Sequence, residues 1–234
     1  MSLDSCSLGD RLRKDDTAGV NFFNIIMSVI DRKILVASTN PGKLAELKSM
    51  LGDDIQWVGL ADFSGIPAIE EDGKTFAENA RKKALGYARA TGLWTIADDS
   101  GLAVDALGGE PGVKSARFAE SYRRDRKERR DSLDKKNIEK LLNLLKGISK
   151  EKRTARFVCC LCLASPEKIL IETEGKLEGF IAEEETGANG FGYDPIFFVP
   201  KLDKTVAQLS REEKNAISHR GIAIRKLKPL LEEL

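Results

Sequence analysis

The sequence changes character at Ser38-Thr39-Asn40-Pro41-Gly42-Lys43. The run before it, Lys33–Ala37, is apolar and rich in β-branched residues, which predicts a buried strand. After it, over Leu44–Leu51, leucine and methionine recur at helical spacing. Asn40 is a favourable N-cap and Pro41 suits the first helical position, so we expect a helix to begin here.

A strand, a short polar loop and a helix N-terminus that carries a lysine together predict an anion site. Free backbone N–H groups and the positive end of the helix dipole both favour a negative ligand at this position. The loop is not a Walker A motif, because Leu44 follows Lys43 and the spaced first glycine is missing. Many α/β proteins begin in this way, so an ordinary structural turn is the alternative interpretation.

Size and charge narrow the range of partners. With 234 residues, of which 41% are hydrophobic and 32% charged, the chain can form one large domain or two small lobes. The formal net charge of +1 gives no global electrostatic reason to expect nucleic acid or an anionic membrane as partner. No stretch approaches the length of a transmembrane helix. We therefore expect neither a nucleic-acid nor a membrane partner.

The cysteines indicate a reducing compartment. Three of them, Cys159, Cys160 and Cys162, lie within the apolar run Phe157–Ala164, and the fourth is Cys6. No second group of cysteine or histidine residues in the sequence completes a metal cluster. Buried, reduced thiols are typical of intracellular proteins, so we expect a cytoplasmic location.

Strand-like and helix-like segments alternate from Lys33 onward, which favours the α/β class. The expected elements are helices at Thr75–Thr91, Asn137–Ile148 and Ile217–Leu227, and strands at Trp94–Ala97, Arg156–Ala164 and Ile169–Lys176. Pro229 is expected to end or kink the last helix. Residues 1–30 differ from the rest and form either a dispensable N-terminal extension or an ordinary arm, whereas residues 31–234 form the domain.

Two acidic clusters, Glu70-Glu71-Asp72 and Asp98-Asp99, are candidates for a magnesium site. Mg²⁺ binds one or two carboxylates together with water and substrate phosphates. Neighbouring side chains on a strand point to opposite faces, so Asp98 and Asp99 are not expected to share one role. We favour Asp99, because it lies nearer to the turn expected at Ser100-Gly101. A solvated loop is the alternative for either cluster.

Two more segments carry groups suited to a nucleotide. The glycines of Gly190-Phe191-Gly192-Tyr193-Asp194-Pro195 allow close approach of a ligand, and Phe191 offers a face on which a base can stack. His219 is the only histidine of the chain. With Lys214 and Arg220 nearby, it would form a group of donors for phosphate and for a carbonyl-bearing base. A turn with core aromatics and a structural histidine are the alternatives.

In combination, these segments resemble one family. From about Lys33 to Lys226 the chain resembles the inosine/xanthosine triphosphate pyrophosphatases, enzymes that remove non-standard purine nucleotides. The resemblance is carried by segments in the same order, namely Ser38–Lys43, Thr75–Ala80, Ala97–Leu102, Pro111–Arg117, Gly190–Pro195 and Ser218–Arg220. The N-terminal extension is the departure from the family pattern.

The resemblance implies a fold and an activity. The fold is expected to be α/β, with a long central mixed β-sheet, flanking helices and two lobes around an active-site cleft, in a homodimer. The family hydrolyses ITP, dITP and XTP between the α and β phosphates, with Mg²⁺ as cofactor, to give the monophosphate and pyrophosphate.

The resemblance also assigns roles to individual residues. Glu70 and Asp99 are expected to hold Mg²⁺, and Asp99 is also expected to activate the attacking water. Arg220 is expected to donate a hydrogen bond to the 6-carbonyl of the purine and so to disfavour adenine. The residues implied to bind the phosphates are Ser38, Thr39, Asn40, Pro41, Gly42 and Lys43, and Ser100 is implied to contact the substrate. Those implied to form the base pocket are Phe191, Gly192, Tyr193 and Asp194. Substrate binding is completed by Lys214, His219 and Arg220, the last two near the purine.

Two other functions stay open at this point. A Maf-like nucleotide pyrophosphatase has a similar architecture but prefers pyrimidines, and His219 and Arg220 beside Phe191 favour a purine instead. A nucleotide sensor without turnover does not need a water-activating carboxylate, so the presence of both Glu70 and Asp99 favours an enzyme.

Overall fold

The computed structural model describes residues 33–52, 55–119 and 130–234, so the expectations for residues 1–30 lie outside the described residues. The strands are β1 (Lys33–Val36), β2 (Gln56–Gly59), β3 (Trp94–Val104), β4 (Thr154–Ala164), β5 (Ile169–Ile181), β6 (Phe197–Val199) and β7 (Lys204–Thr205). The α-helices are α1 (Pro41–Leu51), α2 (Phe76–Thr91), α3 (Arg130–Leu144), α4 (Arg211–Ile217) and α5 (His219–Glu232). A 3-10 helix, η4 (Gly112–Arg117), follows β3.

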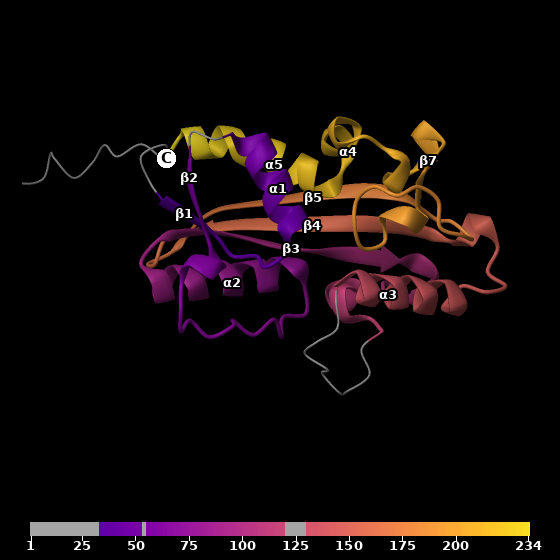
Figure 1. The fold of residues 1–234 in the computed structure, drawn as a ribbon, viewed down its shortest axis with the longest axis horizontal. Coiled ribbons are helices and arrows are strands. Elements are labelled where there is room, and N and C mark those ends of the chain that lie inside the picture. The colour runs from indigo at the N-terminus through magenta and orange to yellow at the C-terminus, as the bar shows by residue number, and fades with distance from the viewer. Residues whose placement is uncertain (1–32, 53–54, 120–129) are drawn as a thin grey trace, which may run out of the picture.

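In the described part of the chain, the strands form a mixed sheet of seven strands in the order β2-β1-β3-β4-β5-β6-β7. β1 is parallel to β2 and β3, whereas β3, β4 and β5 pair antiparallel over long stretches. Figure 1 shows the long strands crossing the molecule, with α5 on one side and α2 on the other. The predicted α/β class is confirmed. No helix within these residues is long and apolar enough to cross a bilayer.

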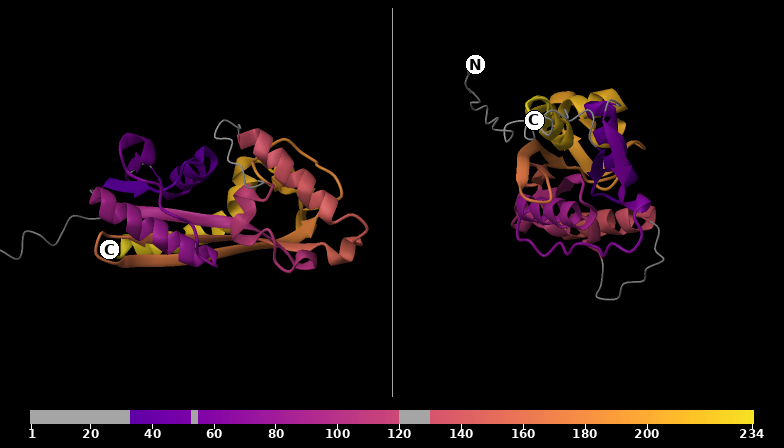
Figure 2. Two further views of the ribbon diagram at one scale, coloured as in Figure 1. Left: turned by 90° about the horizontal axis from the view of Figure 1, so that it is seen from below. Right: turned by 90° about the vertical axis from the view of Figure 1, so that its left-hand side faces the viewer.

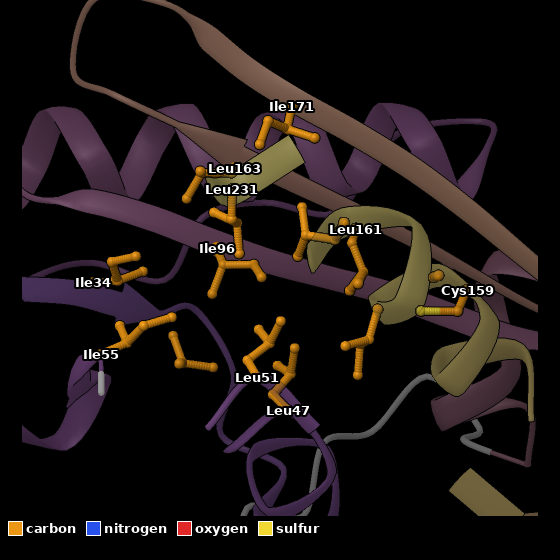
Figure 3. Packing of buried hydrophobic residues seen from close by; sticks show 14 residues of the cluster. Ile34, Leu47, Leu51, Ile55, Ile96, Cys159, Leu161, Leu163, Ile171 and Leu231 are labelled. Atoms are coloured by element: carbon orange, nitrogen blue, oxygen red, sulfur yellow. The ribbon is translucent and has the colours of Figure 1, made fainter. Parts of the chain in front are cut away.

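β4 is buried on both faces, which explains its continuous apolar run. One set of alternate side chains, which includes Cys159 and Leu161, packs with leucines of α1 and α5 (Figure 3). The other set, which includes Cys160 and Cys162, packs against the alanine-rich face of α2. These three cysteines are buried and free.

A third hydrophobic cluster lies at the other end of the long strands. It joins Ile138 and Leu141 of α3 to Phe157 of β4 and Phe197 of β6. Figure 2 shows α3 at the opposite end of the sheet from α2. The core therefore divides into two lobes, and the long strands run through both.

The helix predicted after the polar loop begins as expected. α1 starts at Pro41, and the Oδ1 of Asn40 accepts a hydrogen bond from the backbone N–H of Gly42 at 3.0 Å. Such a cap satisfies a helix N–H that has no partner within the helix and is worth about 1 kcal/mol. Lys43 therefore lies in the first turn, close to the end of β1.

β3 is longer than predicted. It continues to Val104 instead of ending at Ala97, so Asp98 and Asp99 lie in the middle of a strand. Antiparallel pairing with β4 extends along this whole stretch. The turn expected at Ser100-Gly101 is therefore wrong, because long-range pairing overrides the local turn preference of these residues.

The C-terminal helix also differs from the prediction. The expected helix at Ile217–Leu227 is interrupted at Ser218, whose ψ of 154° ends α4. The Oγ of Ser218 then accepts a hydrogen bond from the N–H of Gly221 at 3.0 Å and caps α5. α5 continues past Pro229 to Glu232, so the proline does not end the helix.

Candidate active site

Two hollows lie where the lobes meet, and each contains one group of the predicted site residues. The carboxylate pocket is lined by Ser38, Thr39, Glu71, Lys83, Asp98, Asp99 and Arg117, among others. The aromatic pocket is lined by Asp134, Phe157, Phe191, Gly192, Tyr193, Asp194, Lys214, His219 and Arg220, among others. Both are lined by Asn40, Lys43, Ser100 and Ala116, so the two pockets form one continuous site.

The polar loop before α1 lies at the junction of the two pockets. The Oγ of Ser38 accepts a hydrogen bond from the N–H of Asn40 at 3.1 Å, which holds the loop in a tight turn. Pro41 is exposed and lines neither pocket. Gly42 packs against the ring of Phe191, because a Cβ at this position would lie only 2.8 Å from that ring. The loop is thus fitted to the aromatic side chain of a distant segment.

Asp98 is buried and is bound by cationic side chains. The Nζ of Lys43 lies 2.5 Å from Oδ1, to which the Oγ of Ser100 also donates at 2.8 Å. The Nε of Arg220 donates to Oδ2 at 2.6 Å. Burial would raise the pKa of Asp98, but the charges of Arg220 and Lys43 hold it well below its ordinary value. Asp98 is therefore an ionised anchor for two cations.

Asp99 lies on the opposite face of β3 and is bound less completely. Its Oδ1 accepts a hydrogen bond from the Nζ of Lys83 at 3.0 Å, whereas its buried Oδ2 has no partner among the described residues. Burial raises the pKa of Asp99 to about 6, against the opposing charge of Lys83. A buried carboxylate oxygen without a partner costs free energy unless a ligand binds it. Asp99 is placed to bind a cation or to accept a proton.

The other acidic side chain beside Asp99 belongs to Glu71. Its Oε2 lies 2.9 Å from the Nζ of Lys83, which also donates to the backbone carbonyl of Asp98 at 2.9 Å. Burial would raise the pKa of Glu71, but the charge of Lys83 lowers it. Glu70 is exposed and does not line the pocket. Of the two predicted metal ligands, the structure brings Asp99 to the site but not Glu70.

The carboxylate pair fits a divalent cation that also binds a substrate. The described residues contain no group of three or more histidine, cysteine or acidic side chains that could hold a metal. Mg²⁺, however, commonly takes one or two carboxylates and completes its shell with water and substrate phosphates. Glu71 and the unpaired oxygen of Asp99 would supply two ligands of this kind.

The aromatic pocket is built around Phe191. The Nζ of Lys214 lies 4.4 Å from the centroid of its ring, and the Cζ of Arg220 lies 5.7 Å from it. Gly190 and Gly192 flank the ring with φ values of 81° and 61°, which glycine adopts without strain. The loop presents Phe191 as a platform on which a planar base can stack.

Six charged side chains connect the two pockets in alternating order. Beyond Asp98, the Nη1 of Arg220 lies 2.5 Å from the Oε2 of Glu46. The Nζ of Lys214 lies 3.0 Å from the Oε1 of Glu46 and 2.7 Å from the Oδ2 of Asp194. The order is Lys43, Asp98, Arg220, Glu46, Lys214 and Asp194, and we refer to these six as the charge chain.

Arg220 donates from three of its nitrogen atoms to protein groups. Besides its bonds to Asp98 and Glu46, its Nη2 donates to the Oγ of Ser100 at 2.9 Å, and the residue is 1% exposed. The guanidinium group has five N–H donors, so most of its binding capacity is already used. This arrangement favours a structural role for Arg220 over the predicted contact with the 6-carbonyl.

His219 is buried and uncharged. Its ring stacks on Phe157 with the centroids 4.8 Å apart and the planes at 20°. Burial, together with the charge of Arg220, lowers the pKa of His219 well below its ordinary value. Its Nδ1 is buried without a partner among the described residues. A neutral imidazole carries one donor nitrogen and one acceptor nitrogen, so His219 is suited to hydrogen bonds with a ligand in the pocket.

Three side chains that sequence reasoning missed also lie at the site, namely Glu46, Lys83 and Asp134, whereas Glu71 was named only as a member of the acidic cluster. A signal existed for Lys83, which lies seven residues after Phe76 and three after Ala80, on the buried stripe of the predicted helix. A lysine on such a stripe requires a buried partner. Asp134 carried no comparable local signal.

Comparison with known proteins identifies a single family. The model of the Ham1 family matches residues 34–230. The dITP/XTP pyrophosphatase of Bacillus subtilis (strain 168) is 49% identical over 207 residues, which cover 87% of this chain and 99% of that protein. The dITP/XTP pyrophosphatase of Yersinia pseudotuberculosis is 47% identical over 196 residues, which cover 83% and 95%.

Solved structures show the same architecture. The HAM1 protein from Coxiella burnetii matches with a TM-score of 0.76 and 42% identity, over 87% of this chain and 100% of that one. The Staphylococcus aureus Ham1 protein matches with a TM-score of 0.74 and 44% identity, over 86% and 99%. Because the family model spans most of the sequence and these relatives are matched over almost their whole length, the chain belongs to the Ham1 family.

Proposed function

We propose that this chain hydrolyses non-standard purine nucleoside triphosphates, such as ITP, dITP and XTP, to the monophosphate and pyrophosphate. The observation that carries the proposal is the continuity of two unlike pockets. In one, Asp99 has a buried oxygen without a partner, and the other is built around Phe191. One suits a metal-bound triphosphate and the other a planar base. The relatives named dITP/XTP pyrophosphatase support the same activity.

The nucleotide would lie across the junction of the pockets. The base stacks on Phe191, and the phosphates extend past the first turn of α1 toward Lys83. Lys43 and the N-terminal end of α1 supply positive potential along this path. In this orientation, the α-phosphate lies close to the junction and the leaving group deeper in the carboxylate pocket.

Mg²⁺ is the cofactor that the donor set favours, with Asp99 and Glu71 as its protein ligands. Two carboxylate oxygens leave room for the water and phosphate oxygens that this ion prefers. When bound, Mg²⁺ would neutralise charge on the phosphates and the leaving pyrophosphate. Glu71 takes the place that the sequence reasoning gave to Glu70, because Glu71 lines the pocket and Glu70 does not.

Asp99 also serves as the base. Water attacks the α-phosphorus, the bond from that phosphorus to the bridging oxygen breaks, and pyrophosphate leaves with this oxygen. The carboxylate of Asp99 accepts the proton from the water, and its 3.0 Å contact with Lys83 fixes its orientation. No covalent intermediate is needed, because placement and charge stabilisation supply most of the rate enhancement in such reactions.

The proposal extends to the assembly and the location of the protein. The resemblance to the pyrophosphatase family favours a homodimer, which light scattering on the purified protein would test. The buried free thiols of Cys159, Cys160 and Cys162 favour the reducing cytoplasm as its compartment.

A substrate panel tests the proposed function. Pyrophosphate release is measured with ITP, XTP, GTP, ATP, CTP and UTP, with Mg²⁺ and with EDTA. We expect ITP and XTP to be the preferred substrates and EDTA to abolish turnover. Preference for CTP or UTP would favour a Maf-like enzyme. Tight binding of ITP without release of pyrophosphate would favour a sensor.

A further inference from the structure

Asp134 is an acidic side chain of the aromatic pocket that the proposed mechanism does not use. It lies on α3, in the lobe opposite to α1, and is half-buried beside Phe191 and Gly192. Asp194, the other carboxylate that lines this pocket, is paired with Lys214 at 2.7 Å. Among the residues whose side chains the structure describes, which begin again at Ser132 after the gap, no ion pair involves Asp134. Its negative charge is therefore available to a ligand.

One oxygen of Asp134 is already fixed by the backbone. Its Oδ2 accepts a hydrogen bond from the N–H of Gly192 at 2.9 Å. This bond ties α3 to the loop that carries Phe191 and holds the carboxylate at the wall of the pocket. An ionised carboxylate accepts hydrogen bonds and donates none, and its two oxygens offer several acceptor positions. The remaining acceptor capacity of Asp134 is fixed in place before a base enters.

Purines differ at the ring nitrogen beside carbon 6. A 6-oxopurine such as hypoxanthine carries a hydrogen on N1 and donates there, whereas N1 of adenine carries a lone pair and accepts. A fixed carboxylate therefore gains a hydrogen bond from the first and faces a lone pair in the second. Discrimination of this kind is strong, because the wrong base leaves buried polar groups unpaired.

We propose that Asp134 is a specificity-determining residue that accepts a hydrogen bond from the N1–H of a 6-oxopurine and opposes adenine. This inference rests on the proposed function, and it adds the residue that reads the base. It is independent of Arg220, whose nitrogens are bonded to Asp98, Glu46 and Ser100. Guanine also carries N1–H, so Asp134 separates 6-oxopurines from adenine but does not separate ITP from GTP.

The test exchanges an acceptor for a donor. In Asp134→Asn, the side-chain oxygen can still accept from the N–H of Gly192, while the amide nitrogen now donates toward the base. Asp134→Ala removes both interactions. Glu139→Gln makes the same chemical change at an exposed position of the same helix and serves as the control. For each variant, kcat/KM is measured with ITP, GTP and ATP, and thermal unfolding confirms that the protein is folded.

The expected result is a change in ratios. In Asp134→Asn, the ITP-to-ATP and GTP-to-ATP ratios of kcat/KM should both fall by about 10-fold or more, because a hydrogen bond to a charged acceptor is lost and adenine gains a donor. Asp134→Ala should lower kcat/KM for ITP and GTP without raising it for ATP. Glu139→Gln should change kcat/KM for none of the three nucleotides.

Two outcomes would overturn the inference. An equal fall of kcat/KM for all three nucleotides would show that Asp134 only anchors the loop at Gly192. Unchanged kinetics in both variants would show that the base does not reach this carboxylate. Failure of the proposed function is distinct from either, because the wild-type protein would then hydrolyse none of the purine triphosphates.

Discussion

Asp98 and Asp99 are adjacent on β3, yet they have opposite surroundings. Asp98 is bound by Lys43 and Arg220 on one face of the sheet, while Asp99 faces Lys83 on the other with one buried oxygen unpaired. A carboxylate that is fully paired holds other groups in position, and one that is partly unpaired is free to bind and react. Alternation along β3 thus places two identical side chains in environments that suit different roles.

Replacing Asp99 by asparagine is expected to lower kcat for ITP by about 100-fold or more while the protein stays folded. The amide is a poor ligand for Mg²⁺ and cannot take a proton from water. Steady-state release of pyrophosphate and thermal unfolding measure the two effects. Near-normal turnover in the folded variant would show that a group other than Asp99 accepts the proton.

Asp98→Asn provides the contrasting control. The substitution removes the negative charge that pairs with Arg220 and Lys43 in a buried site. The free energy of unfolding should therefore fall by about 3 kcal/mol or more. Equal stability of the two variants would contradict the division of roles between Asp98 and Asp99.

Glu71→Gln and Glu70→Gln form a matched pair for the metal site. Only Glu71 lines the carboxylate pocket, so Glu71→Gln should raise the Mg²⁺ concentration for half-maximal activity by about 10-fold or more. Glu70→Gln should leave it unchanged. A magnesium titration of activity separates them, and the reverse order of effects would restore Glu70 as the ligand.

The raised pKa of Asp99 predicts that this carboxyl group contributes less to the stability of the metal-free protein at neutral pH than at acidic pH. Its pKa rises from an ordinary value of 3.8 to about 6, so the folded protein holds this proton more tightly than the unfolded chain does. The resulting stabilisation is complete below pH 3.8 and is lost as the pH rises to about 6.

Urea unfolding in EDTA, compared between the wild-type protein and Asp99→Asn, measures this contribution. The free energy of unfolding of the wild type should fall relative to that of the variant across this pH interval. Mg²⁺ should reduce the fall, because it binds the ionised form. Parallel pH curves for the two proteins would argue against a raised pKa.

Arg220→Ala is expected to act on stability more than on the choice of base. It leaves the buried carboxylates of Asp98 and Glu46 without their shared partner, so the melting temperature should drop and activity toward ITP and ATP should fall by similar factors. A selective fall of the ITP-to-ATP ratio of kcat/KM by about 10-fold, with little loss of stability, would instead support the predicted contact with the 6-carbonyl.

Deletion of residues 1–26 should change activity and melting temperature little. The recognisable motifs all begin after Met27, and the match to the family model starts at residue 34. Pyrophosphate release and thermal unfolding of the shortened chain provide the measurement. A large drop in melting temperature would indicate that Phe22, Phe23 and Ile26 pack onto the domain.

Features with local causes could be predicted from the sequence. The start of α1 follows from the capping preference of Asn40 and the fixed φ of Pro41, both of which act within a few residues. The separation of Asp98 from Asp99 follows from the alternation of side chains along a strand. These interpretations needed no knowledge of the rest of the chain, and the structure confirms them.

Features with distant causes could not be predicted. Glu46 and Arg220 are 174 residues apart in sequence, and no periodic pattern connects them. The turn expected after Asp99 was wrong, because pairing with β4 extends the strand. Within the acidic cluster, only tertiary packing decides that Glu71 rather than Glu70 faces Lys83. Sequence patterns identified the segments that form the site, whereas tertiary packing determines which side chains of those segments face it.

If the nucleotide binds across the junction as proposed, the charge chain connects the groups at its two ends. Each of its interior members is held by two neighbours, so the removal of a charge at the base end leaves an unbalanced charge that the next member must share. Such a disturbance can reach Lys43, which would lie beside the phosphates, without movement of the backbone. We therefore expect affinity for the base and affinity for the triphosphate to be coupled, and substitutions at the two ends to combine non-additively in double-mutant cycles.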